Sequence, residues 1–596
     1  MSASISLPKE KWIVRGGRAK PLMEAYGLPF LIARVLAGRL ESEDVTSFLD
    51  RDGELFDPSV MTDLPLAAEL LKTHLDRGEK LFIIGDYDVD GMTSSSILYL
   101  GLKLLYPAGD IHVRIPERIT DGYGFSVEIA REVVEEGCQI VMTCDNGIRE
   151  FDTAAFLKAK GIPMVITDHH AIETTPENGD RIPEADAVVN PHRAEDPSPQ
   201  KEICGAFVAY QLIRYMVSRF KSEEADSVLM KQLMGYAALG TVCDVMPLTH
   251  ENRKLVHQGL RALEKYPTEG IRAMIKTASI KHLDVYAAGF TIGPMINAGG
   301  RLGSQNHFFE AMITTSQPVA TMLAGEMNAL NKTRQYMTDQ GIEEGLKQVE
   351  EHPDDKVVVL YLPELHESIA GLVAGKVREK TGKPVFVITR SQDGLKGSGR
   401  SIEAYSMFES MNRCPELFVK FGGHAMAAGF TLRCEEGHEA EAAEGMREAL
   451  NRTCTLKDED FIPIVYIDST MDPSLMTLDL TKQLDKLGPF GVKNPRPLLA
   501  AKNQRLIGFS VFGRRMNAFR LTFECEHGVY QMISFDRDLM ESFLEDAIGR
   551  ADALRVLQGE RLSRAIMADV LYQASVNDFN GEEMQLIVKH LRSSHG

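Results

Sequence analysis

The sequence predicts an α/β protein built on a parallel, doubly wound sheet, with a helical spacer, a smaller α/β unit and a C-terminal β-barrel behind it. Short apolar runs alternate with segments of helical spacing in the first half of the chain, which is typical of a buried parallel sheet. After about residue 460 strand-like runs dominate, and they indicate a small barrel. At roughly 150 residues per domain, the 596 residues predict about four domains.

The composition excludes several classes of protein. With 44% hydrophobic and 25% charged residues, the chain is ordinary globular material. A net charge of −19 argues against a protein that coats nucleic acid through bulk charge, although it allows a local basic groove. The 8 cysteines include no CxxC pair, so neither a disulfide framework nor a thiolate zinc site is expected. No apolar run resembles a signal peptide or a membrane span, and we expect a cytoplasmic protein.

The first elements predict the parallel sheet. Residues 1–45 form an irregular lead with a short amphipathic helix at 29–40 and a second helix from near Ser42. Four apolar runs follow, each ending in polar residues, and segments of helical spacing separate the first three of them. These runs are LFIIGD (81–86), QIVMTCDNG (139–147), PMVITDHH (163–170) and AVVNPH (187–192).

The remaining elements predict the other units. A loop at 191–199 leads into helical spacing through about Tyr266, and a mostly helical stretch at 305–352 looks like a spacer. Strand-like runs and an acidic helix at 435–450 then indicate a second α/β unit. The expected divisions are the lead at 1–45, the sheet domain at 46–270, a connecting helical region at 271–350, the second α/β domain at 351–455 and the barrel at 456–596.

Polar residues collect at one edge of the predicted sheet. Ligands of open parallel sheets bind outside the carboxyl ends of the strands. Asp86, Asp145, Asp168 and Asn190 all fall at that edge. We therefore expect a single crevice that holds several carboxylates and two histidines.

The segment Asp86-Tyr-Asp88-Val-Asp90-Gly91 resembles the start of a calcium-binding EF-hand loop, but the resemblance fails. Such a loop needs a bidentate acid at its twelfth position, where this chain has Ile97, and an apolar strand stands where a helix should precede it. Acids on a strand-to-helix turn, with Gly91 allowing the bend, suit divalent metals at a sheet edge instead.

Further acids and two histidines complete the predicted metal site. Asp145 lies in TCDNG, Asp168-His169-His170 in TDHH, and Asp244 in GTVCDVMPL near the end of a predicted helix. Carboxylates with imidazole favour Mn²⁺ or Mg²⁺, and two such ions can clamp the attacking and leaving oxygens of a phosphoryl displacement. The alternative for a single acid is a helix cap, as for Asp90 or Asp145, and four acidic motifs at one edge make that alternative unfavourable for the set.

The motifs resemble the DHH phosphoesterase superfamily, which is named for Asp-His-His as found at 168–170, and within it the RecJ exonuclease branch. The resemblance covers most of the chain. The motifs that carry it are DYDVDG (86–91), DGYG (121–124), CDNG (144–147), DHH, NPH (190–192), GTVCDVMPL (240–248), INAGGRLG (296–303), LKGSGRS (395–401), FGGHAMAAG (421–429) and LGPFG with NPRP (487–497).

The resemblance implies roles for the acids and histidines. The metal ligands would be Asp88, Asp90, Asp145, His169 and Asp244. Asp145 would bridge two ions of Mn²⁺ or Mg²⁺. The catalytic group would further include His170, which could contact the scissile phosphate or assist the leaving oxygen, with Asp168 orienting an imidazole and Asp86 beside the metals.

The resemblance also implies substrate contacts outside the metal site. The second α/β unit would be the DHH-associated domain, whose GSGRS and GGHAMAAG segments would be loops that approach a phosphate. The barrel would be an OB-fold that binds single strands, with Phe512 and Phe519 among its arginines. The candidate contacts are Arg301, His366, Ser398, Arg400, Ser401, Gly423, His424, Arg514, Arg515 and Arg520. Simple turn glycines, core phenylalanines and solvated arginines are the structural alternatives.

By the same resemblance the chain would be a 5′→3′ exonuclease for single-stranded DNA that releases mononucleotides in recombination and repair. Its partners would be single-stranded DNA, a single-strand-binding protein and a RecQ-type helicase, and a monomer suits the family. A phosphodiesterase for short oligoribonucleotides or cyclic dinucleotides, a non-catalytic scaffold and an inorganic pyrophosphatase are the competing interpretations. The lead and the barrel argue against the first of these, and the intact acidic motifs argue against the second.

Several positions depart from the family pattern. Glu367 and Ser368 replace a typical Pro-Gly pair, and Lys493 replaces a glycine. Asn517-Ala518-Phe519-Arg520 stands where the barrel usually has His-Leu-Lys. These departures leave the predicted metal site untouched and put the details of strand binding in doubt.

Overall fold

The computed structural model describes residues 10–594 except 41–43, 119, 123, 176–178, 222–226, 392–393, 514–515, 527 and 578–580. The chain forms two compact units, which we call the central unit and the terminal unit. The central unit comprises Thr46–Arg334 and Gly488–Pro495, and the terminal unit comprises Met1–Val45, Gln335–Leu487 and Arg496–Gly596. Within the described ranges, every helix is too short or too polar to cross a bilayer.

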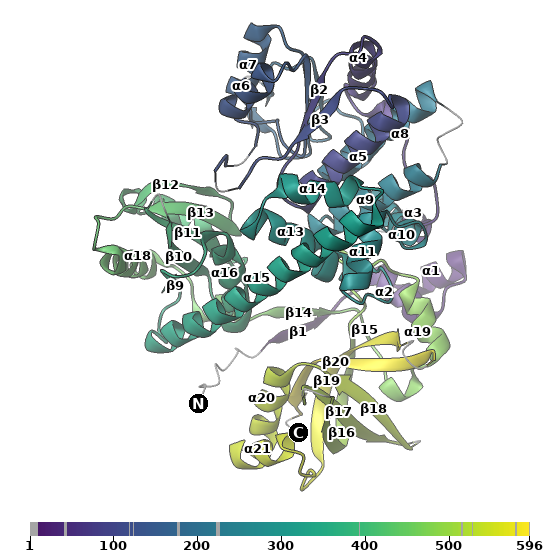
Figure 1. The fold of residues 1–596 in the computed structure, drawn as a ribbon. Coiled ribbons are helices and arrows are strands. Elements are labelled where there is room, and N and C mark those ends of the chain that lie inside the picture. Colours follow the sequence, from purple (N-terminus) through teal and green to yellow (C-terminus); the bar gives the residue numbers. More distant parts are fainter. Residues whose placement is uncertain are drawn as a thin grey trace. The chain divides into compact units, whose positions relative to one another are not determined.

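The central unit contains the predicted parallel sheet (Figure 1). Its strand order is β3-β2-β4-β5-β8, and all neighbours are parallel. Four strands coincide with the apolar runs of the sequence: β2 (Leu81–Ile84), β4 (Ile140–Cys144), β5 (Met164–Thr167) and β8 (Ala187–Val189). The edge strand β3 (Ile111–Arg114) was not predicted, because its polar His112 and Arg114 interrupt the apolar run.

Helices cover both faces of this sheet (Figure 1). One core packs alternate strand residues such as Ile83 and Met142 against α4 (Leu64–Asp76), α5 (Val89–Leu105), α8 (Gly205–Phe220) and α9 (Val228–Cys243). A second core packs residues such as Val141 and Ile166 against α6 (Val127–Glu135) and α7 (Phe151–Lys160). Because both faces are buried, the four strands β2, β4, β5 and β8 are largely apolar, as the sequence indicated.

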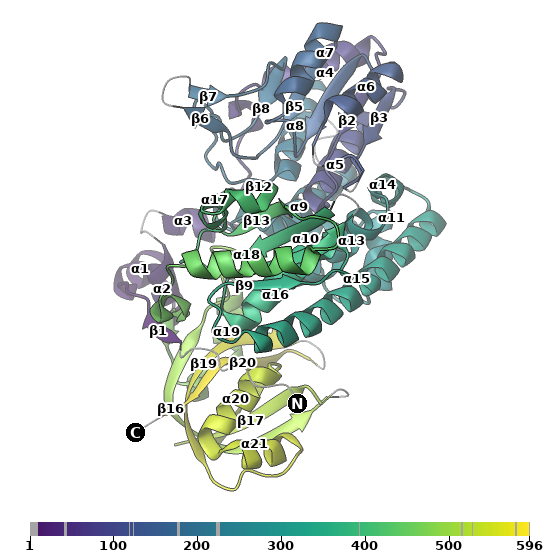
Figure 2. The same cartoon turned by 90° about the vertical axis from the view of Figure 1, so that its left-hand side faces the viewer.

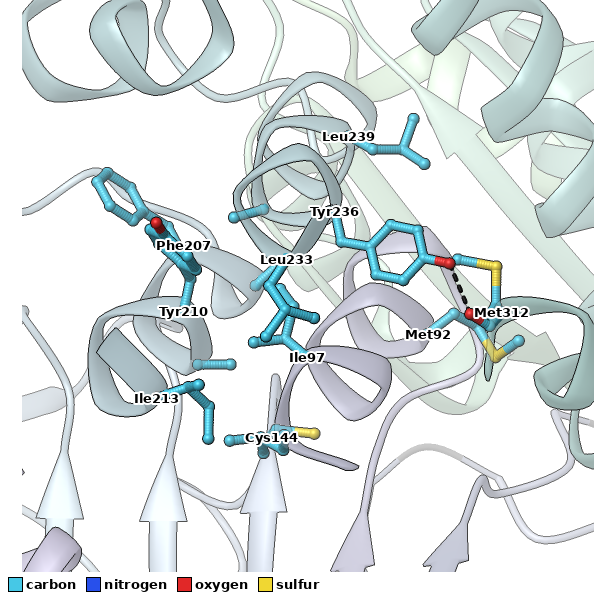
Figure 3. Close-up of a cluster of buried hydrophobic side chains, with 14 of the residues drawn as sticks. Met92, Ile97, Cys144, Phe207, Tyr210, Ile213, Leu233, Tyr236, Leu239 and Met312 are labelled. Atoms are coloured by element: carbon cyan, nitrogen blue, oxygen red, sulfur yellow. Dashed lines mark hydrogen bonds between the residues drawn. The ribbon is translucent and has the colours of Figure 1, made fainter. Parts of the chain in front are cut away.

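Figure 3 shows part of the first core, where buried hydrophobic side chains pack together. The labelled side chains come from α5, α8, α9, the end of β4 and α14 (Gln305–Ile313), and Tyr236 is fully buried among them. Its hydroxyl donates to the carbonyl of Met312 at 2.6 Å, so the buried polar atom keeps a partner.

Helices complete the central unit. They are α10 (His250–Lys265), α11 (Glu269–Thr277), α12 (Val285–Ala287), the π-helical turn η3 (Ala288–Ile292), α13 (Gly293–Leu302), α14 (Gln305–Ile313) and the first half of α15 (Gln317–Glu351). The expected helical spacer at 305–352 is thus α14 and α15. A small hairpin of β6 (Glu173–Thr175) and β7 (Gly179–Arg181) follows β5.

The second α/β sheet lies in the terminal unit, in the order β12-β13-β11-β10-β9. Its strands are β9 (Val358–Tyr361), β10 (Val385–Ser391), β11 (Gly394–Arg400), β12 (Phe418–Gly423) and β13 (Ala427–Leu432), of which β9 and β10 are parallel and the others antiparallel. Helix α16 (Ala370–Thr381) packs on one face. Helices α17 (Met407–Asn412) and α18 (Glu439–Thr453) pack on the other.

The C-terminal strands form the predicted barrel (Figure 2). They are β16 (Leu499–Phe512), β17 (Ala518–Cys525), β18 (Gly528–Ser534), β19 (Ile566–Asn577) and β20 (Glu583–Ser593), and a β16–β19 pairing closes the ring. The short β15 (Ser469–Thr470) pairs in parallel with the start of β16, and α19 (Leu478–Asp485) lies between these two strands in the sequence. Helices α20 (Arg537–Ile548) and α21 (Arg550–Leu557), and strand β19, were not predicted.

The N-terminal lead is more ordered than the sequence suggested. Strand β1 (Lys11–Val14) pairs in parallel with β14 (Ile464–Ile467), and helices α1 (Ala19–Tyr26), α2 (Phe30–Arg39) and α3 (Asp44–Leu49) follow. Arg39 donates two hydrogen bonds of 2.7 Å to the buried carboxylate of Asp468. Helices α2 and α3 match the two helices expected in the lead, but the expectation of an irregular start is wrong for β1 and α1. The sequence did not indicate β1 because its pairing partner lies about 450 residues later.

Candidate active site

The turn between β2 and α5 brings three acids to the edge of the central sheet. Asp88 caps α5, and its Oδ1 accepts hydrogen bonds from the backbone N–H groups of Asp90 (2.8 Å) and Gly91 (3.1 Å). A Cβ on Gly91 would overlap the backbone of Asp86, so only glycine allows the chain to fold back so tightly. The residue that caps α5 is therefore Asp88, whereas the sequence had suggested Asp90 as a possible helix cap.

Asp90 is anchored by a second helix. Its two carboxylate oxygens accept hydrogen bonds from the backbone N–H groups of Gly205 (2.6 Å) and Ala206 (2.9 Å), at the start of α8. The carboxylate is 1% exposed. These two hydrogen bonds from the start of a helix fix the orientation of the Asp90 carboxylate.

Asp145 occupies a strained position at the end of β4. Its φ of 60° lies in the left-handed region, which is rare for residues other than glycine. The neighbouring Asn146 donates to the carbonyls of Ile84 (3.2 Å) and Cys144 (2.9 Å) and so ties the ends of β2 and β4 together. Asp145 does not cap α7, whose N-cap residue is Glu150, so the capping alternative is wrong here.

Asp168 orients the two histidines that follow it. Its Oδ1 accepts hydrogen bonds from the backbone N–H groups of His169 (2.7 Å) and His170 (3.1 Å) and lies 2.8 Å from His170 Nδ1, while its Oδ2 accepts from Ile148 N–H (2.9 Å). Burial alone would raise the pKa of Asp168, but the bonds and charge of His170 lower it to about 2. Burial alone would lower the pKa of His170. The hydrogen bond and the charge of Asp168 outweigh burial and raise that pKa to about 9.

His169 lies at the centre of the acids. Its Nε2 is 3.0 Å from Asp145 Oδ1, 3.6 Å from Asp90 Oδ2 and 3.6 Å from Asp244 Oδ2. Burial lowers the pKa of His169, so the imidazole is neutral at physiological pH and can act as a metal ligand. The acid Asp244 reaches this point from the C-terminal end of α9.

The ligand atoms fall into three groups, in each of which every atom lies within 4.8 Å of the others. Asp145 belongs to two of them, and His169 also belongs to two. The groups are Asp86-Asp88-Asp145, Asp145-His169-His170 and Asp90-His169-Asp244. Asp145 therefore links two of the groups, and Asp86 joins the ligand candidates as well.

The electrostatics of the cluster require positive charge. Asp86 Oδ1, Asp145 Oδ1 and Asp244 Oδ2 are buried and accept no hydrogen bond from any described residue. Burial, together with neighbouring carboxylates, raises the pKa of Asp86 and of Asp244 to about 8 and that of Asp145 well above its usual range. Buried carboxylates facing one another with open oxygens match a site for divalent cations, and the oxygen and imidazole donors fit Mn²⁺ or Mg²⁺.

Arg301 lies beside the acid-bearing turn. The last turn of α13 carries it, and a Cβ on the adjacent Gly300 would be 2.8 Å from the carbonyl of Tyr87. Gln305 donates to the same carbonyl at 2.5 Å. Sequence reasoning missed Arg118, whose guanidinium stacks 4.9 Å from the centre of the Tyr87 ring. The sequence signal that could have identified Arg118 is its position three residues before the DGYG motif.

In the second α/β sheet the GSGRS segment is not the expected loop. It lies in β11, whose residues pair with β10 on one side and β13 on the other, so their backbone N–H groups are committed to the sheet. A Cβ on Gly397 would overlap the ring of Phe430. The glycines therefore serve close packing, and the prediction that this backbone approaches a phosphate is wrong.

The side chains of this strand remain candidates for substrate contact. Arg400 Nη1 donates to Ser398 Oγ at 3.2 Å, and both side chains lie over Gly371 in the first turn of α16. His366 caps the 3₁₀ turn η4 (Glu367–Ile369) in front of that helix. Glu367, one of the departures from the family pattern, forms an ion pair of 3.0 Å with Lys396. Lys396, Ser398 and Arg400 lie on the same face of β11, because every second residue of a strand points to the same side.

The other candidates have different surroundings. Ser401 is buried, and its hydroxyl donates to the carbonyl of Tyr405, which favours a structural role. Gly423 and His424 lie at the exposed tip between β12 and β13, where Gly423 has φ of 139° and a Cβ would overlap the backbone of Ala427. This glycine is required by the turn.

On the barrel, Arg520 lies exposed on β17 with its guanidinium 5.1 Å from the centre of the Phe512 ring. Phe519 is fully buried and belongs to the core of the barrel, so the structural alternative holds for that residue. Arg514 and Arg515 lie outside the described residues.

Comparisons with protein families match three parts of the chain. The DHH family N-terminal domain matches residues 80–241, the DHHA1 domain residues 354–455 and the RecJ OB domain residues 467–590. The first of these matches contains every acidic motif of the central sheet except Asp244.

Curated relatives and solved structures agree with these matches. The single-stranded-DNA-specific exonuclease RecJ of Haemophilus influenzae is 30% identical over 92% of this chain and 93% of the relative. The protein of the same name from Bacillus subtilis is 29% identical over 96% of this chain and 69% of the relative. The crystal structure of RecJ from Thermus thermophilus in complex with Mn²⁺ has a TM-score of 0.77 and 25% identity, covering 99% of this chain and 80% of that one.

Proposed function

This chain belongs to the RecJ family of single-stranded-DNA-specific exonucleases, and we propose that it removes nucleotides from an end of single-stranded DNA by metal-dependent hydrolysis. The observation that carries this proposal is the convergence of three carboxylates on His169 Nε2, with Asp145 shared between two ligand groups. Two ions of Mn²⁺ or Mg²⁺ held there would stabilise the charge that develops on the attacking and leaving oxygens.

The chain's own residues supply the remaining chemistry. Asp88, Asp90, Asp145, His169 and Asp244 would hold the ions, with Asp86 close enough to assist. His170 carries a proton at neutral pH, because Asp168 raises its pKa to about 9, and its side chain is 41% exposed. It can therefore contact a phosphate oxygen or donate a proton to the leaving oxygen, while Asp168 keeps the ring in place.

The remaining details are proposals that rest on the family resemblance. The enzyme would work in the 5′→3′ direction, release mononucleotides and act in recombination and repair. It would be a cytoplasmic monomer, and it would work with a single-strand-binding protein and a RecQ-type helicase. Arg301, His366, Ser398, Arg400 and the barrel residue Arg520 would contact the strand.

A digestion experiment tests the activity. A long single-stranded DNA, labelled in separate samples at its 5′ or its 3′ end, is incubated with the full chain in EDTA or in Mn²⁺. We expect immediate release of the 5′ label as mononucleotide, only with Mn²⁺, and no digestion of a blunt duplex. Release of the 3′ label first would overturn the polarity, and cleavage of only dinucleotides or cyclic dinucleotides would identify a small-substrate phosphodiesterase.

Matched variants assign the activity to the cluster. Asp145→Asn should lower the rate at least about a thousandfold, because several kcal/mol of transition-state stabilisation depend on the bound ions. Asp110→Asn makes the same change at an exposed carboxylate of the central unit and should leave the rate unchanged. Equal activity of Asp145→Asn and the wild type would remove the cluster from the mechanism.

A further inference from the structure

The most exposed large hydrophobic side chains among the described residues gather around one part of the central unit. Phe290 is 70% exposed, Tyr286 69% and Val245 63%. Val245 directly follows the ligand candidate Asp244, and it has φ of 60°, a strained conformation for a β-branched residue. Tyr286 and Phe290 belong to the helical segment formed by α12, η3 and α13.

Tyr286 and Phe290 form a stacked pair of rings. Their centroids are 5.0 Å apart and their planes are inclined by 22°. A pair of aromatic residues four positions apart stabilises a helix only modestly. This small stabilisation does not explain why two large rings are left exposed to water. A flat, exposed aromatic surface of this kind offers a stacking partner for another planar group.

The ring pair is fixed to the metal-ligand cluster through α9. The Sγ of Cys243, the residue before Asp244, donates to the carbonyl of Ala288 at 3.6 Å. A Cβ on Gly293 would be 2.5 Å from the same Sγ, and one on Gly289 would be 3.3 Å from Val242. The π-helical turn that carries Phe290 therefore lies against the last turn of α9, and turns of this type are frequent at functional sites.

The other end of the same helical segment reaches the turn between β2 and α5. Arg301, in the last turn of α13, lies about 16 Å further along the axis than Phe290, at 1.5 Å per residue. There Gly300 approaches the carbonyl of Tyr87, between Asp86 and Asp88. One continuous segment thus carries a pair of exposed rings near Asp244 and a cation near the β2–α5 turn.

The charge of the protein favours bases over phosphates as the groups held at this surface. The chain has a net charge of −19, and the adjacent cluster is rich in carboxylates, so bulk attraction for a phosphate backbone is weak. Stacking of a base on an aromatic ring does not depend on net charge and accepts any base.

We propose that Tyr286 and Phe290 form a base-stacking platform for the single strand as it enters the metal site. This inference rests on the proposed function and adds the residues that hold the bases there. The platform accepts bases without regard to sequence, and the phosphates that follow extend toward Arg301. Phe290 and Tyr286 contact substrate but take no part in bond cleavage.

Binding measurements on the full chain test the platform. A fluorescent oligothymidylate, labelled at its 3′ end, is titrated in EDTA so that no cleavage occurs, and anisotropy gives the Kd. Phe290→Leu keeps an apolar side chain but removes the aromatic face, and we expect it to weaken binding between about fivefold and a hundredfold. Phe290→Trp and Tyr286→Phe keep a ring and should bind like the wild type. Phe30→Leu, at an aromatic residue 59% exposed on α2, is the matched control and should change nothing.

Two further readouts separate stacking from other causes. An abasic site placed at successive positions from the 5′ end should weaken wild-type binding at one or two adjacent positions, and Phe290→Leu should lose that discrimination. The slope of log Kd against log salt should be the same for both proteins, because no phosphate contact is removed.

Each outcome decides the proposal. Equal affinity of Phe290→Leu and the wild type would overturn it, and so would a weakening by Leu that persists at every abasic position, because such a loss would not come from stacking on a base. If the wild type binds the strand but digests nothing, the proposed exonuclease activity fails while the platform stands. If the wild type does not bind the strand, both fail.

Discussion

The two α/β sheets of this protein use glycines and polar residues in opposite ways. In the central sheet the motif residues follow the strands, where Gly91 lets the chain fold back and Asp145 accepts a left-handed backbone. In the second sheet the motif GSGRS lies inside β11, where Gly397 makes room for the ring of Phe430. The same residue types therefore build a charged pocket in one place and a packed strand in the other. Substitutions should harm chemistry in the first sheet and folding in the second.

Among the predictions that compare the two sheets, the largest effect is expected at the end of α9. Asp244→Asn removes one of the three carboxylates around His169 Nε2, so we expect activity to fall at least about a hundredfold. The same change relieves repulsion among buried acids, and the free energy of unfolding of the metal-free chain should rise by about 1–3 kcal/mol. Digestion rates and urea unfolding in EDTA check the two parts. A variant that loses activity because it is less stable would break the contrast between the sheets.

The pH dependence of the metal-free chain gives the next effect. Burial and neighbouring carboxylates hold the pKa of Asp86 and Asp244 at about 8, so the folded chain keeps protons that the unfolded chain releases above about pH 4. The free energy of unfolding in EDTA should therefore fall as pH rises from about 4 to 8. Mn²⁺ must displace these protons, and its affinity should rise by up to about tenfold per pH unit for each proton that it displaces.

Thermal melts in EDTA and in Mn²⁺, at pH values between about 6 and 8, measure both trends. The stabilisation by Mn²⁺ should grow with pH, and Asp244→Asn should flatten both curves. A melting temperature in EDTA that is independent of pH, or that rises with pH, would show that the carboxylates do not carry the raised pKa values.

The chemistry of the central sheet was predictable because it depends on local pattern and one topological rule. Asp86, Asp145 and Asp168 each end an apolar run, and parallel strands bring such ends to one edge. The sequence could not show that Asp88 rather than Asp90 caps α5, because both precede the same helix. Nor could it show that Asp90 is held by α8, which lies more than 100 residues later.

The misses elsewhere arise from partners that lie far along the chain. Strand β1 is apolar only in part, and its partner β14 lies about 450 residues later in the sequence. A glycine inside a strand has the same local signature as a glycine in a loop, and Phe430 decides the role of Gly397 from another strand. Such tertiary causes leave no mark in a window of neighbouring residues.

The packing role of the second sheet's glycines leads to a smaller effect. Gly397→Ala should lower the free energy of unfolding by about 1–3 kcal/mol, because its methyl group would overlap the Phe430 ring. Chemical denaturation with a probe of the terminal unit, such as the fluorescence of Trp12, measures the loss. Phe430→Leu should recover part of the stability when combined with Gly397→Ala. A variant of unchanged stability that binds DNA more weakly would return the segment to the role of a phosphate-binding backbone.

The smallest expected effect concerns Lys493, which stands where the family has glycine. Its φ of 57° lies in the left-handed region, and its ammonium forms an ion pair of 2.9 Å with Glu202, itself more than half exposed. Lys493→Gly should remove a backbone penalty of about 1 kcal/mol, while an exposed pair contributes about 0.5 kcal/mol or less. The free energy of unfolding of the central unit should therefore rise slightly. Glu202→Gln isolates the ion pair and should change stability by less than the glycine does. A loss of stability in Lys493→Gly that Glu202→Gln reproduces would show that the ion pair, and not the backbone, explains the departure from the family pattern.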